Sequence, residues 1–290
     1  MNKCCIQTQQ ATLTKSSNIV DIYSSSSSSS NSSSSSSRGS SNGSMSNDDD
    51  YPVIITEATR QHIERRVRAA YEFFDRVLRL YDVSQLIFCF NGGKDCTVLL
   101  DLLMRYCREH GIASRQIPML YIESDDSFPE IDDFVVHCVR RYDVNLIKYK
   151  DSLKVALTHM TEDMPRIKAV FVGSRNTDPY CQHLQPMQKT DSDWPDIMRL
   201  NPLLEWSYHD IWHYIHMHKV PYCQLYAQGY TSIGYRSNTL PNPHLQHSSC
   251  SPAKPAAAPA AAAAAAVACF KPAWELADPT TERAGRLNRK

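Results

Sequence analysis

Residues 86–97 read LIFCFNGGKDCT, and this stretch decides the fold. The apolar residues 86–90 predict a buried strand, a short loop follows, and an amphipathic helix is expected to start near Thr97. Two adjacent glycines let the backbone approach a ligand closely, and the N–H groups at a helix N-terminus attract phosphate oxygens. Lys94 adds a positive charge, and Asp95 adds a carboxylate that can contact magnesium. The stretch therefore predicts a site for the phosphates of a nucleotide.

The loop matches neither of two common nucleotide-binding motifs. A Walker loop needs four residues between its glycines and a hydroxyl residue after its lysine, and the dinucleotide fingerprint spaces its glycines differently. The loop resembles instead the PP-loop of the ATP-pyrophosphatase superfamily, usually S-G-G-x-D-S, whose enzymes split ATP between the α and β phosphates. Taken alone, a strand, two glycines and a helix also make an ordinary tight turn, so the rest of the chain must decide.

Charge is balanced in this chain, with 31 basic and 31 acidic residues among 290. That balance leaves no electrostatic footprint for nucleic acid or an anionic membrane. No apolar run reaches the roughly 18 residues of a membrane span, and residues 1–20 lack a signal-peptide core. The ten cysteines show no C-x-x-C pairs and are expected to be free thiols in a reducing compartment. We expect a cytoplasmic protein without nucleic-acid or membrane partners. A mitochondrial location is the minority alternative, because residues 1–20 are rich in Ser and Thr and lack acids.

Low-complexity segments divide the chain into four parts. Residues 1–50 are dominated by serine runs that cannot bury a core, so we expect a disordered tail. Residues 51–245 are expected to form one domain. Residues 246–268 are rich in Ala and Pro and indicate a linker or surface insertion. Residues 269–290 are expected to form a C-terminal segment that packs back on the domain.

Predicted helices and strands alternate along the domain. The helices are expected at 56–81, 97–110, 129–141 and 152–161, and the strands at 86–90, 119–122, 145–149 and 169–172. Such alternation predicts a doubly wound α/β fold, in which helices cover both faces of a mostly parallel sheet. Ligands bind these sheets at the carboxyl ends of strands, where the strand order reverses. If the order is 3-2-1-4, as in the PP-loop family, the loop after residue 90 lies beside the segment after residue 172.

That segment is GSRNTDPY, residues 173–180. Gly173 permits close backbone approach, Arg175 offers a planar fork for phosphate, and Asp178 is a rigid carboxylate because a proline follows it. The alternative is that Arg175 and Asp178 simply pair with each other. The turn ESDDSFPE, residues 123–130, leaves a similar choice, since its acids can bind metal or act as turn and cap residues.

A histidine-rich helix is expected at residues 207–219. His209, His213 and His216 share one face, a geometry that can bind zinc. The apolar residues of this helix point to the opposite side, so we expect the histidines to be solvated rather than zinc ligands.

The stretch TDSDWPDIMRLNPLLEWSY, residues 190–208, is similar to the flavin motif of eukaryotic FAD synthases. These FMN adenylyltransferases, built on a PAPS-reductase-like PP-loop fold, also carry N-G-G-K-D-C, G-x-R-x-T-D-P-Y and G-Y-T-S-[IL]-G, which begin here at Asn91, Gly173 and Gly229. The likeness covers residues 63–245 and resumes in the tail, FKPAWELADPTTERAGR. It implies synthesis of FAD from ATP and FMN with Mg²⁺, on a PP-loop (adenine nucleotide hydrolase-like) fold with a C-terminal flavin-binding extension.

The resemblance also implies a role for each candidate residue. The expected catalytic residues are Lys94, Asp95, Arg175, Arg283 and Arg286, the expected ATP-binding residues are Asn91, Gly92, Gly93, Lys94 and Gly173, and the expected flavin-binding residues are Asp178, Asp191, Asp193, Trp194 and Arg199. Asp95 and Asp178 are the expected metal ligands. Trp194 suits stacking on a planar flavin, whereas Leu203, Leu204 and Trp206 are expected in the core. For Arg283 and Arg286 the alternative is an exposed basic terminus.

Other functions on the same fold stay open from sequence alone. A PAPS reductase-like protein would need a catalytic cysteine in an E-C-G context, which neither Cys250 nor Cys269 has. Another PP-loop adenylating enzyme would not need the Trp194 motif, and a non-catalytic flavin or nucleotide sensor would not need its charged residues. We expect a single activity in a monomer, with a weak dimer as the alternative.

Overall fold

The computed structural model describes residues 18–19, 53–247 and 269–287. Its centre is a sheet with the strand order β1-β4-β3-β2-β5-β7-β6. The strands are β1 (Asn18–Ile19), β2 (Leu86–Phe90), β3 (Met119–Ile122), β4 (Leu146–Tyr149), β5 (Ala169–Phe171), β6 (Met187–Lys189) and β7 (Met198–Leu200). Strands β2, β3, β4, β5 and β7 run parallel, while β1 and β6 pair antiparallel at the two edges.

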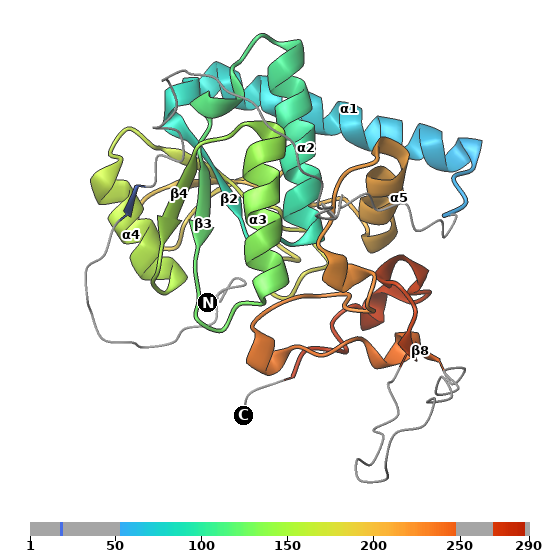
Figure 1. Ribbon diagram of the computed structural model, residues 1–290. Coiled ribbons are helices and arrows are strands. Elements are labelled where there is room, and N and C mark those ends of the chain that lie inside the picture. Colours follow the sequence, from blue (N-terminus) through green and yellow to red (C-terminus); the bar gives the residue numbers. More distant parts are fainter. Residues whose placement is uncertain (1–17, 20–52, 248–268, 288–290) are drawn as a thin grey trace, which may run out of the picture.

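Helices cover both faces of this sheet (Figure 1). They are α1 (Glu57–Leu80), α2 (Lys94–Glu109), α3 (Pro129–Tyr142), α4 (Leu153–Asp163) and α5 (Tyr208–His218). The larger core packs α1, α2, α3 and α5 on one face, and a smaller core packs α4 on the other through Ile87, Leu120 and Met160. The predicted doubly wound α/β fold is confirmed. The order β4-β3-β2-β5 is the expected 3-2-1-4 arrangement, so the loops after β2 and β5 are neighbours.

Local chemistry explains where the helices begin. Thr56 caps α1 by accepting the backbone N–H of Thr59 at 3.1 Å, and a proline starts α3. The prediction that α2 begins near Thr97 was too late. Gly93 takes an extended conformation and caps the helix, and the Thr97 N–H already donates to the Gly93 carbonyl at 2.9 Å. Lys94 is therefore the first residue of α2, within reach of the loop.

The C-terminal segment lies against α5 and the loops below the sheet (Figure 1). Strand β9 (Cys269–Phe270) pairs with β8 (Gln246–His247). The hydroxyl of Tyr208 donates to the Ala273 carbonyl at 2.7 Å, and the ring of Trp274 meets that of Trp212 at a centroid distance of 5.4 Å. These buried contacts hold residues 269–287 beside the carboxyl ends of the strands.

Some predictions concern residues that the structure describes only in small part. Most of 1–50 and of 246–268 lies outside the described ranges, which include Asn18–Ile19 as β1 and Gln246–His247 as β8. Cys4, Cys5 and Cys250 also lie outside them. The expectation of free thiols holds for Cys89, Cys96, Cys107, Cys138, Cys181 and Cys223. It is wrong for Cys269, which is disulfide-bonded. Within the described ranges, no helix combines the length and apolarity needed to cross a membrane.

Candidate active site

Glycines bring the loops after β2 and β5 close together. Gly92 has φ of +72°, a conformation that favours glycine, and a Cβ there would lie 2.9 Å from Cγ2 of Ile131 on α3. A Cβ on Gly173, just after β5, would lie 3.0 Å from both the backbone nitrogen and the Sγ of Cys96 in α2. The sheet order predicted this approach, and the missing side chains are what permit it.

The N–H groups of the first loop already have partners inside the protein. The Gly93 N–H donates to Oδ1 of Asn91 at 2.9 Å, and the Lys94 N–H donates to the hydroxyl of Tyr226 at 2.8 Å. A phosphate that used these two amides would have to replace Asn91 and Tyr226 as acceptors. The Gly93 and Lys94 amides thus donate to groups within the protein.

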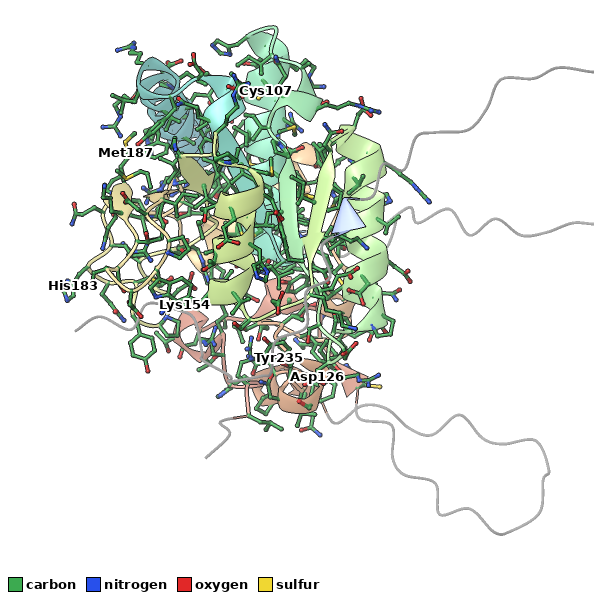
Figure 2. The ribbon with its side chains drawn as sticks, turned by 90° about the vertical axis from the view of Figure 1, so that its left-hand side faces the viewer. Cys107, Asp126, Lys154, His183, Met187 and Tyr235 are labelled. Carbon is green, nitrogen blue, oxygen red and sulfur yellow. The ribbon has the colours of Figure 1, made fainter. Side chains whose placement is uncertain are left out.

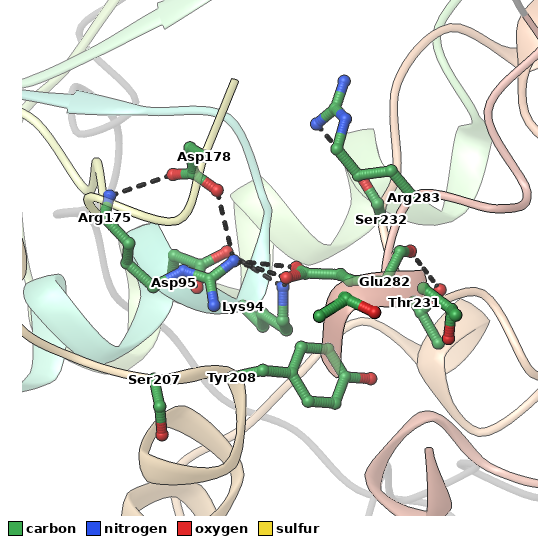
Figure 3. A network of polar contacts seen from close by, with 12 residues as sticks. Lys94, Asp95, Arg175, Asp178, Ser207, Tyr208, Thr231, Ser232, Glu282 and Arg283 are labelled. Atoms are coloured by element: carbon green, nitrogen blue, oxygen red, sulfur yellow. Dashed lines mark hydrogen bonds and ion pairs between the residues drawn. The ribbon is translucent and has the colours of Figure 1, made fainter. Parts of the chain in front are cut away.

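Four of the predicted residues form one buried ion-pair network (Figure 3). The side chains of Lys94 and Arg175 are only 2% and 1% exposed. The Nζ of Lys94 donates to Oδ2 of Asp95 at 3.0 Å, and the Nε of Arg175 lies 2.9 Å from Oδ1 of Asp95. The Nη2 of Arg175 also donates to Oδ1 of Asp178 at 3.2 Å. The pairing of Arg175 with Asp178 that the sequence left open is present, and Arg175 reaches the first loop as well.

The network contains one residue that the sequence analysis missed. Oε1 of Glu282 accepts hydrogen bonds from Nζ of Lys94 at 2.5 Å and from Nη2 of Arg175 at 2.8 Å. Its Oε2 accepts from the same Nη2 at 2.7 Å. Glu282 lies in the C-terminal segment, 188 positions from Lys94. The signal that could have found it is an acidic residue directly before Arg283 in a tail that resembles the family.

Three carboxylates share two cations in this network, and the pKa values of Asp95, Asp178 and Arg175 reflect it. Burial favours the neutral form of Asp95, but Arg175 and Lys94 hold the pKa of Asp95 below its usual value. Burial and then the charge of Asp95 raise the pKa of Asp178. Burial opposes the charge on Arg175, but Asp95 and Glu282 raise its pKa, so the guanidinium stays protonated. The site thus has one carboxylate more than its cations balance.

This excess of negative charge bears on the predicted metal ligands. Across the described ranges, no three acidic, histidine or cysteine side chains converge on one metal position. Magnesium in nucleotide sites is commonly held by one or two carboxylates together with substrate phosphates. Asp95 and Asp178 fit that requirement as a partial ligand set. The buried Nη1 of Arg175, which has no hydrogen-bond partner, is a matching donor for a phosphate oxygen.

The predicted arginines Arg283 and Arg286 converge on a different side chain. The Nη1 atoms of both lie 3.4 Å from Oγ of Ser232, which follows Thr231 in the third motif. Figure 3 shows Glu282 directed at Lys94 while the neighbouring Arg283 is directed away from it. The guanidinium groups of Arg283 and Arg286 therefore lie at the border of the buried network, because Glu282, which belongs to that network, directly precedes Arg283.

Of the predicted flavin residues, Asp178 belongs to the buried network, whereas Asp191, Asp193 and Trp194 form a separate cluster. Trp194 is half-buried against the smaller core, and Nζ of Lys154 lies 5.7 Å from its ring centroid. The same Nζ donates to Oδ2 of Asp193 at 2.9 Å, while the Asp191 carbonyl accepts the Trp194 N–H. Arg199 in β7 has a buried Nε without a hydrogen-bond partner. Among the described residues, no hydrogen bond or ion pair joins Trp194, Asp191 or Asp193 to Lys94 or Arg175. Leu203, Leu204 and Trp206 are buried, as predicted.

The acidic turn after β3 forms hydrogen bonds and an ion pair within the protein rather than a cluster of metal ligands. The carboxylate of Asp126 accepts the Ser237 N–H at 3.0 Å and the Ser237 hydroxyl, and the Asp126 carbonyl accepts the Arg236 N–H at 2.8 Å. Figure 2 shows Asp126 beside Tyr235 at one end of the molecule. Asp125 pairs with Lys150 at 2.6 Å. These contacts support the turn role of the acids, whereas the N-cap of α3 is Phe128, without a side-chain cap.

The histidines of α5 are less solvated than predicted. Ser207 caps this helix, and its apolar residues are buried as expected. Nε2 of His209 is 3.0 Å from the Leu276 carbonyl, and the ring of His216 packs at 5.1 Å from that of Trp274. The expectation of solvated histidines was wrong because the C-terminal segment, far away in the sequence, covers that face of the helix.

Comparison with known proteins follows the same motifs. Residues 85–166 and 153–241 match the phosphoadenosine phosphosulfate reductase domain family. The probable FAD synthase of Schizosaccharomyces pombe is 34% identical over 231 residues, which cover 78% of this chain and 80% of the relative. That of Caenorhabditis briggsae is 35% identical over 235 residues, 81% of this chain. The chain spans only 42% of the length of the Caenorhabditis briggsae relative.

Solved structures give the same result. The chain is similar to Candida glabrata FMN adenylyltransferase in complex with ATP, with 30% identity, a TM-score of 0.69, and coverage of 82% of this chain and 92% of the other. The complex of the same enzyme with FMN and an ATP analogue gives a TM-score of 0.70 at 28% identity, covering 81% of this chain and 94% of the other. The fold therefore agrees across most of the described residues.

Proposed function

The chain belongs to the FAD synthase family, and from that premise we propose that it transfers the adenylyl group of ATP to FMN, giving FAD and pyrophosphate. The observation that carries the proposal is the joint burial of Lys94 and Arg175 at the carboxyl ends of β2 and β5. Two buried cations from two different motifs, one with a spare donor, suit a triphosphate. The fold is similar to that of an FMN adenylyltransferase solved with ATP, with FMN and an ATP analogue, and with FAD and pyrophosphate.

The proposed reaction needs positioning and charge neutralisation more than proton transfer. An oxygen of the FMN phosphate attacks the α-phosphorus of ATP in line, the new P–O bond forms, and the bond to the pyrophosphate oxygen breaks. The attacking phosphate is already ionised near neutral pH, so no general base is required. Lys94 and Arg175 hold the β and γ phosphates, and their positive charges offset the negative charge that develops on the leaving pyrophosphate.

Magnesium and flavin complete the proposal. Asp95 and Asp178 would hold Mg²⁺ together with phosphate oxygens, and the ion would supply further neutralisation of phosphate charge. Trp194 would stack on the isoalloxazine, with Asp191, Asp193 and Arg199 placed to meet polar groups of FMN. Arg283 and Arg286 would face the phosphate chain. The cytoplasmic location and monomeric state expected from the sequence stay predictions.

The test is direct turnover. The purified chain is incubated with FMN, ATP and Mg²⁺, and FAD and pyrophosphate are followed by chromatography, with riboflavin and PAPS replacing FMN as control substrates. We expect equimolar FAD and pyrophosphate with FMN only, and loss of turnover when EDTA removes divalent ions. Binding of FMN and ATP without FAD formation would instead favour a sensor.

A matched pair of variants separates the two parts of the site. Trp194→Ala should raise the KM for FMN and leave the KM for ATP near that of the wild type, because Trp194 lies in its own cluster. Leu240→Ala removes an exposed apolar side chain of 53% exposure and serves as the control. If Trp194→Ala changed both KM values equally, the assignment of this cluster to the flavin would fail.

A further inference from the structure

Glu282 occupies the donors that the proposed function assigns to phosphate. Its carboxylate is only 12% exposed and bridges Nζ of Lys94 and Nη2 of Arg175. Two buried cations that converge on one carboxylate oxygen are the arrangement a phosphate oxygen would meet. Glu282 thus supplies the negative charge that a phosphate would bring to these two cations.

The same carboxylate and a polyphosphate cannot hold these donors together. Both are negative, and like charges in a buried, low-dielectric site repel each other strongly. The network already contains one carboxylate more than its two cations balance. Adding a triphosphate while Glu282 stays in place would increase the unbalanced charge further. Binding therefore requires the Glu282 side chain to move away.

The backbone around Glu282 is held by hydrogen bonds that do not involve its carboxylate. The Thr231 hydroxyl donates to the Glu282 carbonyl at 2.6 Å, and Nδ2 of Asn242 donates to the Thr281 carbonyl at 2.9 Å. Thr231 and Asn242 are buried. The carboxylate, in contrast, is held only by the two cations among the described residues. Rotation about side-chain bonds is thus the motion that frees the site, and it leaves the segment docked.

We propose that Glu282 is a specificity-determining residue that acts as an internal competitor for the phosphate site, and this inference rests on the proposed function. Because Glu282 is part of the chain, its carboxylate competes without the loss of translational and rotational entropy that accompanies binding of a free anion. A single phosphate or sulfate, with few other contacts, fails to displace it. A polyphosphate that also contacts the neighbouring loop displaces Glu282. The return of Glu282 after the reaction then helps to expel pyrophosphate.

Glu282→Gln tests this competition because it keeps the shape and removes the charge. The variant leaves two cations facing two carboxylates, so the folded state stays balanced and should form. Isothermal titration calorimetry measures the Kd of pyrophosphate, and separately of inorganic phosphate, without and with Mg²⁺. We expect pyrophosphate without Mg²⁺ to bind about tenfold more tightly to the variant than to the wild type, and inorganic phosphate to become a detectable ligand.

Glu275→Gln is the matched control, since Glu275 lies in the same segment and pairs at 3.1 Å with Lys271. It should bind both anions as the wild type does. Melting temperatures of both variants check folding, and Glu282→Asp, whose shorter side chain has less reach toward the two cations, provides a second variant with the charge kept. We expect the aspartate variant to bind pyrophosphate more tightly than the wild type.

The outcomes separate this inference from the proposed function. Unchanged or weaker pyrophosphate binding by folded Glu282→Gln, in a protein whose wild type makes FAD, would overturn the competition. Loss of binding only in the presence of Mg²⁺ would also overturn it and identify Glu282 as a metal ligand. A wild-type chain that forms no FAD but whose glutamine variant gains pyrophosphate affinity would refute the adenylyl transfer and retain Glu282 as the competitor.

Discussion

The hydroxyl of Tyr226 accepts the backbone N–H of Lys94 at 2.8 Å. The ring is buried against Trp212, with a centroid distance of 5.3 Å. Burial, and then the charge of Asp95, raises the pKa of Tyr226 well above its usual value, so the phenol stays neutral. One aromatic side chain after α5 thereby fixes the first amide of α2, where the phosphate site begins.

Tyr226→Phe should lower the free energy of unfolding by about 1–3 kcal/mol, because the Lys94 N–H loses its acceptor in a buried place. Urea denaturation of the variant and the wild type measures this change. Tyr235→Phe is the control, since Tyr235 is 45% exposed and its replacement should shift stability little. Equal stability of the Tyr226 variant and the wild type would mean that the amide finds another partner.

Lys94→Met should reduce the rate of FAD formation by roughly two orders of magnitude or more, since the side chain has similar length but no charge to stabilise the leaving group. It should also lower stability, because three buried carboxylates would then face one cation. Steady-state kinetics with saturating FMN and ATP gives the comparison. Lys189→Met, which removes a surface lysine paired with Asp196, should retain full activity. Near-normal turnover of Lys94→Met would contradict the phosphate role.

Arg175→Lys should destabilise the protein by about 3 kcal/mol and also impair turnover. Arg175 contacts Asp95, Asp178 and Glu282 through a planar fork, whereas lysine offers one point charge and leaves buried carboxylates without partners. Thermal and urea unfolding measure the loss. If the lysine variant matched the wild type in both stability and activity, the fork geometry would not matter.

Gly92→Ala should cost more stability than Gly111→Ala, although both glycines have positive φ, +72° and +69°. Both variants carry the strain of a left-handed backbone, about 1–2 kcal/mol. A Cβ at Gly92 also lies 2.9 Å from Cγ2 of Ile131, whereas nothing lies within 4 Å at Gly111. Urea unfolding of each variant, and of Gly92→Ala combined with Ile131→Ala, measures the contact. A double variant no more stable than the sum of its two single changes would argue against the clash.

His216 should make the protein less stable as the pH falls from about 6.5 to about 4. Burial, and then His213, lowers the pKa of His216 to about 4, so between these pH values the unfolded chain binds a proton that the folded chain does not. Its contribution is fully present above the unfolded pKa and declines toward the folded pKa. Because the ring is only half-buried, we expect a loss of about 1–2 kcal/mol.

The pH prediction is measured by urea unfolding at pH 7 and pH 4.5. His216→Gln should show a smaller decrease between the two than the wild type, since glutamine does not titrate. His183→Gln, which replaces an exposed histidine on a loop, is the control and should decrease as the wild type does. An identical pH dependence in all three proteins would assign the effect to other groups.

The α/β alternation and the position of the first loop were predictable from residues close together in the sequence. An apolar run such as residues 86–90 is stable only where it is covered on both faces, and two glycines followed by a helix favour a tight connection at the carboxyl end of that strand. The order β4-β3-β2-β5 followed from the family resemblance and placed Arg175 beside Lys94. Neither inference needed a contact between distant parts of the chain.

What only the tertiary structure decided is which groups complete the site. Contacts between segments far apart in the sequence decide the hydrogen bond from the Lys94 N–H to Tyr226, the partial burial of the α5 histidines and the entry of Glu282. Periodicity reports the neighbours of a residue along one helix or strand, and it carries no information on which distant loop folds over the end of a sheet. The sequence by itself therefore determined the sheet and the two cations, whereas the carboxylate that bridges them depends on how the C-terminal segment folds over the end of the sheet.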